Sequence, residues 1–158
     1  MSNIRSMEIS DVARAAEIQA FAMQSTSLYT LLPNISEIVA RLTKILSDST
    51  CESYVYDDGA IKGFAVAGPC YDKDIANGFE LWYIYVDPTA QRQGIGTKLA
   101  AYFEETALRR GHKKLCLRTL EKNAVARTFY EELGYGPDGA RVFIEAVAAY
   151  QIRYFKEI

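Results

Sequence analysis

The segment from Phe79 to Leu99 reads FELWYIYVDPTAQRQGIGTKL and decides how the chain folds. Its first eight residues are apolar apart from Glu80, which predicts a central strand covered on both faces. Asp87 and Pro88 form a turn, and Gly94 and Gly96 precede an amphipathic helix. A strand that runs through a glycine-rich turn into a helix presents unpaired backbone amides to an anion. The segment therefore predicts a phosphate-binding loop, with Arg92 adding positive charge.

Two common phosphate loops do not fit this spacing. A Walker A loop needs a lysine directly after its second, more distant glycine, and none is present. The dinucleotide fingerprint needs a third glycine or alanine three residues after Gly96, but position 99 is leucine. A dinucleotide-binding enzyme therefore stays only as an alternative with a partial match.

Two motifs resemble the GNAT superfamily of N-acyltransferases. Gln91, Gly94 and Gly96 meet the Gln/Arg-x-x-Gly-x-Gly/Ala pattern of that superfamily's acetyl-CoA loop. Residues 123–135, NAVARTFYEELGY, resemble its second motif, in which an asparagine opens a helix and a Phe-Tyr pair precedes Gly-Tyr or Gly-Phe. The motifs occur in the right order and cover about residues 79–136. The resemblance implies an N-acetyltransferase that moves an acetyl group from acetyl-CoA to a primary amine of a small molecule or peptide.

The remaining patterns predict alternating strands and helices in one α/β domain spanning residues 1–158. The resemblance implies that the sheet is mixed and mostly antiparallel, with flanking helices and a V-shaped split between its fourth and fifth strands. The run 141–149 is ambiguous between helix and strand. The predicted strands are Ile4–Ile9, Glu52–Tyr56, Ile61–Pro69, Phe79–Val86, Lys114–Thr119 and Tyr150–Ile158, and the predicted helices are Asp11–Gln24, one beginning at Asn34, one after Gly96, and Ala124–Leu133.

The resemblance also implies where acetyl-CoA lies. Its pantetheine arm is expected to pair with a strand edge, its pyrophosphate to sit on loop amides, and the second motif to contact the arm. Asn123 is also a favoured helix N-cap, and both roles can hold at once. The expected cofactor residues are Ile84, Tyr85, Val86, Gln91, Arg92, Gln93, Gly94, Ile95, Gly96, Thr97, Asn123 and Tyr130.

Tyr130 and Glu80 are the candidate catalytic residues. Tyr130 matches the family's usual proton donor to the CoA sulfur, although a core aromatic is the alternative in a chain with 11 tyrosines. Glu80, a lone carboxylate in an apolar strand, stands where histone-type members carry their general base; a structural, paired carboxylate is the alternative. The branch that acetylates ribosomal proteins carries its base five residues before the asparagine, and Arg118 stands there in this chain.

The acceptor-binding residues are the least defined part. In the family the acceptor contacts the segment between the first two helices and the last loops, here Met23–Pro33 and Pro137–Ala149. Asp72, Asp74 and Glu80 flank the start of the central strand and would suit a cationic amine. A non-catalytic acyl-CoA-binding sensor module is the alternative to an enzyme, since it would need the glycine loop but neither Tyr130 nor Glu80.

Composition narrows the partners. A net charge of −2 gives no basic field for general nucleic-acid binding, and no apolar run reaches membrane-spanning length. The lack of a signal-peptide core and three scattered cysteines favour a cytoplasmic protein with reduced thiols. With one histidine and no paired-cysteine spacing, no metal site is expected. The expected partners are acetyl-CoA and an amine, with a homodimer as the candidate assembly.

Overall fold

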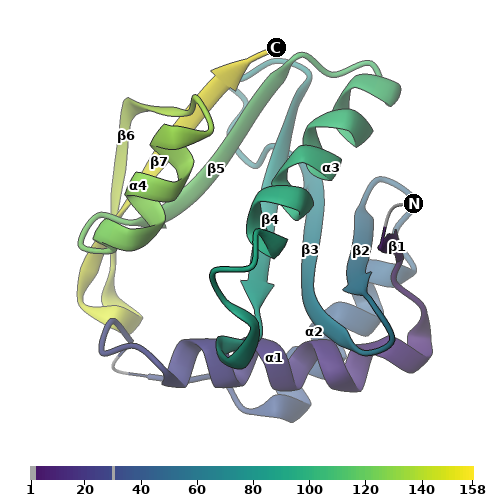
Figure 1. Cartoon of the computed structure of the whole chain (residues 1–158). Coiled ribbons are helices and arrows are strands. Elements are labelled where there is room, and N and C mark those ends of the chain that lie inside the picture. The colour runs from purple at the N-terminus through teal and green to yellow at the C-terminus, as the bar shows by residue number, and fades with distance from the viewer. Residues whose placement is uncertain (1–2, 30) are drawn as a thin grey trace.

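A seven-stranded sheet forms the centre of the molecule (Figure 1). The computed structural model describes residues 3–29 and 31–158. The strands lie in the order β1-β2-β3-β4-β5-β7-β6, and only β4 and β5 pair in parallel. The mixed, mostly antiparallel sheet is therefore confirmed, and the dinucleotide-binding alternative, which needs a mostly parallel sheet, is wrong. The strands are β1 Ile4–Ser6, β2 Glu52–Asp57, β3 Ile61–Pro69, β4 Gly78–Val86, β5 Lys114–Leu120, β6 Gly136–Ile144 and β7 Ala149–Glu157.

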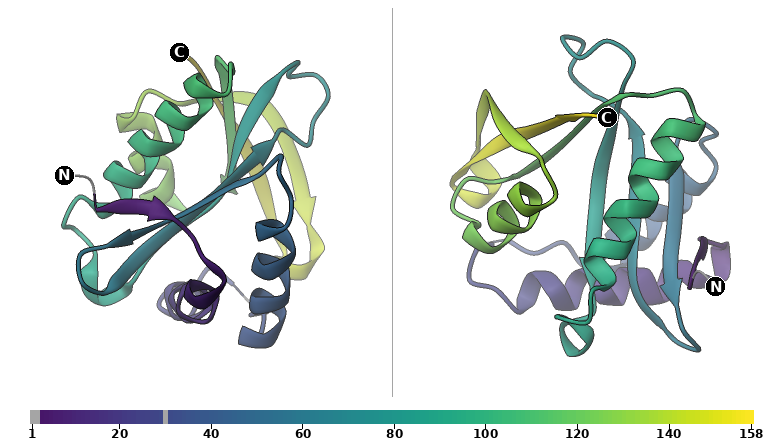
Figure 2. Two further views of the ribbon diagram at one scale, coloured as in Figure 1. Left: turned by 90° about the vertical axis from the view of Figure 1, so that its right-hand side faces the viewer. Right: turned by 45° about the horizontal axis from the view of Figure 1, so that its top comes forward.

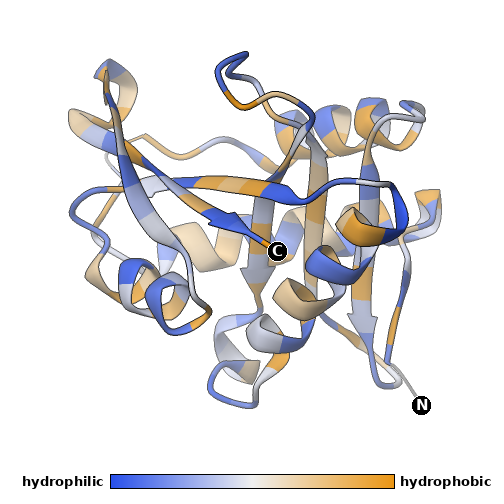
Figure 3. Ribbon diagram, turned by 90° about the horizontal axis from the view of Figure 1, so that it is seen from above, coloured by the Kyte–Doolittle hydropathy of each residue, from blue (hydrophilic) through white to orange (hydrophobic). Residues whose placement is uncertain are grey.

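Helices cover both faces of the sheet (Figure 2). One core packs α3 against β4, with Leu99 and Phe103 near Phe79. The other core packs α1 and α2 against the opposite face, with Leu42 near Phe64. Hydrophobic segments occur on both the strands and the helices, and the turns are more hydrophilic (Figure 3). The α-helices are α1 Val12–Gln24, α2 Ile35–Leu46, α3 Ile95–Arg109 and α4 Ala124–Glu132, and the short 3₁₀ turns are η1 Ile9–Asp11, η2 Pro88–Ala90 and η3 Glu145–Val147.

Local signals explain several of these boundaries. Asn34 caps α2 by accepting a hydrogen bond of 2.8 Å from the Glu37 amide. Gly111 has φ +85° directly after α3, a conformation that few other residues adopt. The predicted first strand was too long, because β1 ends at Ser6 and the chain turns into η1. The ambiguous run 141–149 completes β6 and then forms η3.

The sheet splits between β4 and β5, as the resemblance implied. The two strands pair only from Gly78–Leu81 with Lys114–Leu117 and then separate. A β-bulge promotes the separation: Tyr83 pairs with Val66 and Leu81 with Ala67, which leaves Trp82 as the extra residue of β4. Beyond Leu81, the edge of β4 that faces β5 carries no strand partner, so its backbone groups border an open cleft.

None of the described helices combines the length and apolar character needed to cross a membrane.

Candidate active site

A groove of about 960 Å³ runs from the glycine loop into the split of the sheet. Every residue predicted to contact the cofactor lines this groove except Gln93, which is exposed in the same loop. The sequence prediction missed Lys122, Phe129 and the segment 25–28, which also line it. Residues 25–28 belong to the stretch Met23–Pro33, which was expected to contact the acceptor. They line the groove instead.

The loop at one end of the groove has the geometry of an anion-binding site. Arg92 and Gly94 both have positive φ, +63° and +78°. Gly94 precedes α3 and no side chain caps the helix, whose first bond from Lys98 N to Gly94 O measures 3.0 Å. The amides before Lys98 therefore lie at the positive end of the helix dipole without a side-chain acceptor. A phosphate group would supply the missing acceptor.

The unpaired edge of β4 forms one wall of the groove. Ile84, Tyr85 and Val86 hydrogen-bond to β3 on one side and face the cleft on the other. An extended ligand with amide groups, such as a pantetheine arm, can pair with such an edge as an added strand does.

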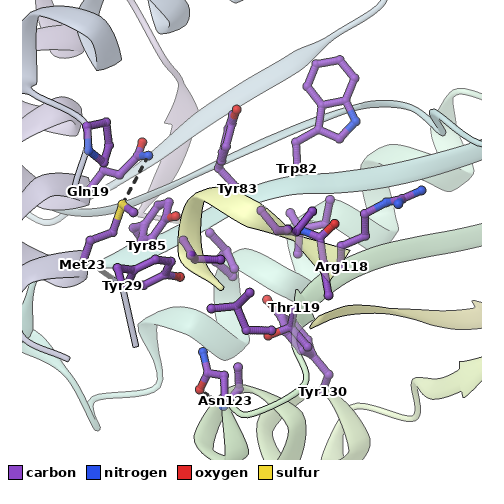
Figure 4. Close-up of a pocket in the computed structure, with 18 of the residues that line it drawn as sticks. Gln19, Met23, Tyr29, Trp82, Tyr83, Tyr85, Arg118, Thr119, Asn123 and Tyr130 are labelled. Carbon is purple, nitrogen blue, oxygen red and sulfur yellow. Dashed lines mark hydrogen bonds between the residues drawn. The ribbon is translucent and has the colours of Figure 1, made fainter. Parts of the chain in front are cut away.

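A second cavity of about 500 Å³ lies on the α1/α2 side of the split. It is called the acceptor chamber after the role proposed for it below. Side chains of β4 lie opposite Asn123 and Tyr130, and Gln19, Met23 and Tyr29 close one end (Figure 4). The chamber and the groove share seven lining residues, so the two cavities meet in the split. The shared residues are Met23, Tyr29, Ile84, Tyr85, Asn123, Ala126 and Tyr130.

Tyr130 lies at this junction. Its side chain is buried, and its ring contacts Phe129, Tyr135 and Tyr154 with centroids 5.2–6.3 Å away. Its hydroxyl forms no hydrogen bond with any described residue, although Tyr130 lines both cavities. Burial, assisted by nearby Tyr29, raises the pKa of Tyr130 well above its usual value. The phenol therefore stays protonated at neutral pH and can donate a hydrogen bond into the junction.

Asn123 caps α4, and its position leaves the expected contact with the cofactor open. Its Oδ1 atom accepts a hydrogen bond of 3.1 Å from the Ala126 amide and so caps α4. Because Asn123 also lines both cavities, its side-chain NH₂ group is the part that can serve a ligand.

Glu80 lies outside both large cavities. It is 2% exposed, accepts a hydrogen bond of 3.1 Å from the Tyr71 amide, and lies 3.3 Å from Arg118 Nε. It lines a smaller cavity of about 290 Å³, which adjoins the acceptor chamber at Leu81, Trp82, Arg118 and Gln151. Arg118, at the position where the ribosomal branch is expected to carry its base, thus stands between Glu80 and the chamber. The role of Glu80 as a base stays a prediction.

The acidic residues near the start of β4 are held by arginines. Arg118 pairs with Asp72 as well as Glu80. Arg153, only 6% exposed, contacts Asp72 and Asp74 at 2.8 Å and Asp138 at 2.6 Å. Because these carboxylates already have guanidinium partners, they no longer argue for a cationic acceptor.

The fold also brings two distant cysteines together. Sulfur atoms of Cys70 and Cys116 and a carboxylate oxygen of Glu80 lie within 4.8 Å of one another. A hydrogen bond with Cys70, together with burial, raises the pKa of the Cys116 thiol. The thiol is therefore protonated, and Glu80 is already engaged with Arg118, so the group is poorly prepared to bind a cation. No spacing in the sequence indicated this cluster.

Comparison with known proteins agrees with the fold. The model of the Acetyltransferase (GNAT) family matches residues 16–135. The chain therefore belongs to the GNAT acetyltransferase family, the class of enzyme that the two motifs resemble.

Solved structures share this fold. Ribosomal-protein-alanine N-acetyltransferase from Brucella melitensis is 21% identical over 98% of this chain and 99% of its own, with a TM-score of 0.80. Ribosomal-protein-S18-alanine N-acetyltransferase from Escherichia coli is 22% identical over 100% and 94%, with a TM-score of 0.77. The structure of yncA from Salmonella typhimurium with its cofactor acetyl-CoA is 20% identical over 98% and 92%, with a TM-score of 0.73. At these identities the likeness concerns the fold alone.

Proposed function

We propose that this protein transfers the acetyl group of acetyl-CoA directly to a primary amine of a small molecule or peptide. The observation that carries the proposal is the junction at Tyr130, where the loop-ended groove meets a separate chamber. The yncA structure, which contains acetyl-CoA in the same fold, supports the identity of the donor. We do not propose a ribosomal protein as the substrate, because Arg118 stands where the ribosomal branch is expected to have its base.

Each part of the groove has a role in holding acetyl-CoA. The loop amides and Arg92 would bind the pyrophosphate, and the free edge of Ile84–Val86 would pair with the pantetheine arm. The thioester would then lie at the junction. A backbone N–H of β4 beyond the bulge could polarise the thioester carbonyl, because those groups lack a strand partner.

The chemistry needs two proton movements. The amine nitrogen attacks the carbonyl carbon, the carbon–sulfur bond breaks, and the leaving thiolate takes a proton, for which the unpartnered Tyr130 hydroxyl is the donor. The amine loses a proton to a base or a water chain. Glu80 remains the predicted base, acting from the adjoining cavity. The described lining of the chamber itself contains Arg41 and Arg118 and no carboxylate, and like charge disfavours an ammonium group there.

Two measurements test the function. Calorimetry with acetyl-CoA tests binding, and thiol release with a panel of primary amines, with mass detection of the acetylated products, tests transfer. We expect micromolar binding and one thiol for each amide formed. Binding without amine-dependent release would instead indicate the non-catalytic acyl-CoA sensor. The homodimer and the cytoplasmic location stay predictions.

A further inference from the structure

The acceptor chamber contains a positive charge that no described residue pairs with. Arg41 of α2 lines the chamber and is exposed, and it forms no ion pair or hydrogen bond with any described residue. Arg118, the other arginine of the lining, is paired with Asp72 and Glu80. The two guanidinium groups therefore differ in availability, and only that of Arg41 is free to bind a ligand.

A second polar group in the chamber also lacks a good partner. Gln19 of α1 is 3% exposed and lines the chamber. Among the described residues, its amide nitrogen reaches only the Met23 sulfur, at 3.9 Å, and a thioether is a weak acceptor (Figure 4). Buried amides are normally well bonded. A ligand that accepts hydrogen bonds in the chamber would complete the bonding of Gln19.

The positive charge of Arg41 acts on Tyr85, which lines both cavities. Burial raises the pKa of Tyr85, and the positive charge of Arg41 acts in the opposite direction. The carboxylates near the start of β4 that would attract a cationic acceptor are held by Arg118 and Arg153. The rest of the chamber lining combines apolar and aromatic side chains with uncharged polar ones.

We propose that the acceptor is a small primary amine that also bears an anionic group, bound by Arg41 with help from Gln19. The amine end would point to the junction at Tyr130 and the anionic end to α2. A planar guanidinium binds carboxylate and phosphate oxygens in a bidentate manner, so it suits either anion. The proposal rests on the proposed function, since it assigns the second substrate of the same site.

The chain provides its own probe for the test. Trp82 is the only tryptophan and lines the chamber, so its fluorescence reports occupancy without turnover. Free protein and protein saturated with CoA are titrated with three amines of similar body: L-leucine, L-leucinamide and the aminophosphonate analogue of leucine. L-leucine and the aminophosphonate separate a carboxylate preference from a phosphate preference, and L-leucinamide removes the negative charge.

Arg41→Gln is the test variant, and Lys44→Gln, a cation on the same helix outside the chamber lining, is the matched control. We expect at least one anionic amine to bind about tenfold or more tightly than leucinamide. Arg41→Gln should abolish this preference, and Lys44→Gln should retain it. Equal binding of anionic and neutral amines, or a preference that survives Arg41→Gln, would overturn the proposal. If the proposal fails but neutral amines still cause thiol release, the proposed acetyltransferase function stands. Failure to bind acetyl-CoA would instead overturn the proposed function itself.

Discussion

The groove and the acceptor chamber meet at Tyr130 but are built in different ways. The end of the groove that is proposed to hold phosphate comes from one continuous stretch, from the end of β4 to the first turn of α3, and its proposed contacts are mainly backbone amides. The chamber is formed by side chains of α1, α2, β4, β5 and β7 and of the segments between them. Backbone recognition depends on conformation, and side-chain recognition depends on which residues the fold brings together.

This difference bears on what each region can bind. Amides at a helix N-terminus and the free edge of a strand suit any ligand with a phosphate and an extended amide arm. The chamber instead carries particular side chains, such as Arg41, Gln19 and Trp82, and we propose that their identities set the acceptor. We therefore expect substitutions in the groove to affect acetyl-CoA binding, and substitutions in the chamber to affect the acceptor or the rate.

The largest effect is expected from Gly94→Asp. An aspartate would adopt the positive φ of +78° at a cost of about 1–2 kcal/mol and place a negative charge beside the pyrophosphate. Acetyl-CoA affinity, measured by calorimetry, should fall by about two orders of magnitude or more. Gly111→Asp is the matched control, because Gly111 has φ +85° and open space at the other end of α3. Gly111→Asp should lower the stability of the protein but keep its affinity for acetyl-CoA. Equal affinity of the two variants for acetyl-CoA would show that the loop does not bind CoA.

Tyr130→Phe tests the junction. Removing the hydroxyl should lower kcat about 100-fold, the usual contribution of a positioned acid, and leave the KM for acetyl-CoA nearly unchanged because the ring still packs. Tyr135→Phe is the control: that buried hydroxyl donates to Glu104 at 3.1 Å and lines neither cavity. It should cost about 1 kcal/mol of stability and leave kcat intact. Full turnover by Tyr130→Phe would make Tyr130 only a core aromatic.

Glu80→Gln shows whether the smaller cavity takes part in the chemistry. The melting temperature should fall, because glutamine cannot pair with Arg118 by charge. If Glu80 is the base, kcat/KM also falls and the acidic limb of its pH profile disappears or shifts upward. An unchanged profile with a lower melting temperature would assign Glu80 to the support of Arg118 and leave deprotonation to water.

The smallest functional effect is expected from Asp11→Asn, which lies in neither region. Hydrogen bonds from Arg5 at 2.7 Å and from the Glu8 amide at 2.8 Å hold the pKa of Asp11 below its usual value, against the opposing effect of burial. A lowered folded-state pKa adds stability above about pH 4 that is lost as the pH falls through the folded value. Since Arg5 is partly exposed, the variant should lose about 1 kcal/mol at pH 7.

Urea unfolding of wild type and Asp11→Asn at pH 7 and pH 3 measures this difference. The difference in the free energy of unfolding between the two proteins should be smaller at pH 3 than at pH 7. At pH 7, kcat and both KM values should be unchanged. A gap of the same size at both pH values would show that the charge of Asp11 contributes nothing.

The loop end of the groove could be predicted from the sequence, whereas the chamber could not. Hydrophobic pattern and glycine spacing are local, so β4, the loop and α3 could be predicted within a residue or two. The cleft beside them was expected only from the family resemblance. The bulge at Trp82 depends on the register of β4 against β3, which no local pattern encodes. Register also places Glu80 beside Cys116 and near Arg118 of β5. Arg41 and Gln19 reach the chamber because of how α1 and α2 pack on the sheet, so the sequence did not indicate that they line it.

A crystal structure with CoA bound tests the central claim most directly. The account predicts that the pyrophosphate lies on the amides of the loop before Lys98, that the pantetheine arm pairs with Ile84–Val86, and that the sulfur lies within hydrogen-bonding reach of the Tyr130 hydroxyl. The acceptor chamber should remain open beside the sulfur. A CoA molecule bound outside the groove, or a sulfur atom far from Tyr130, would contradict the account.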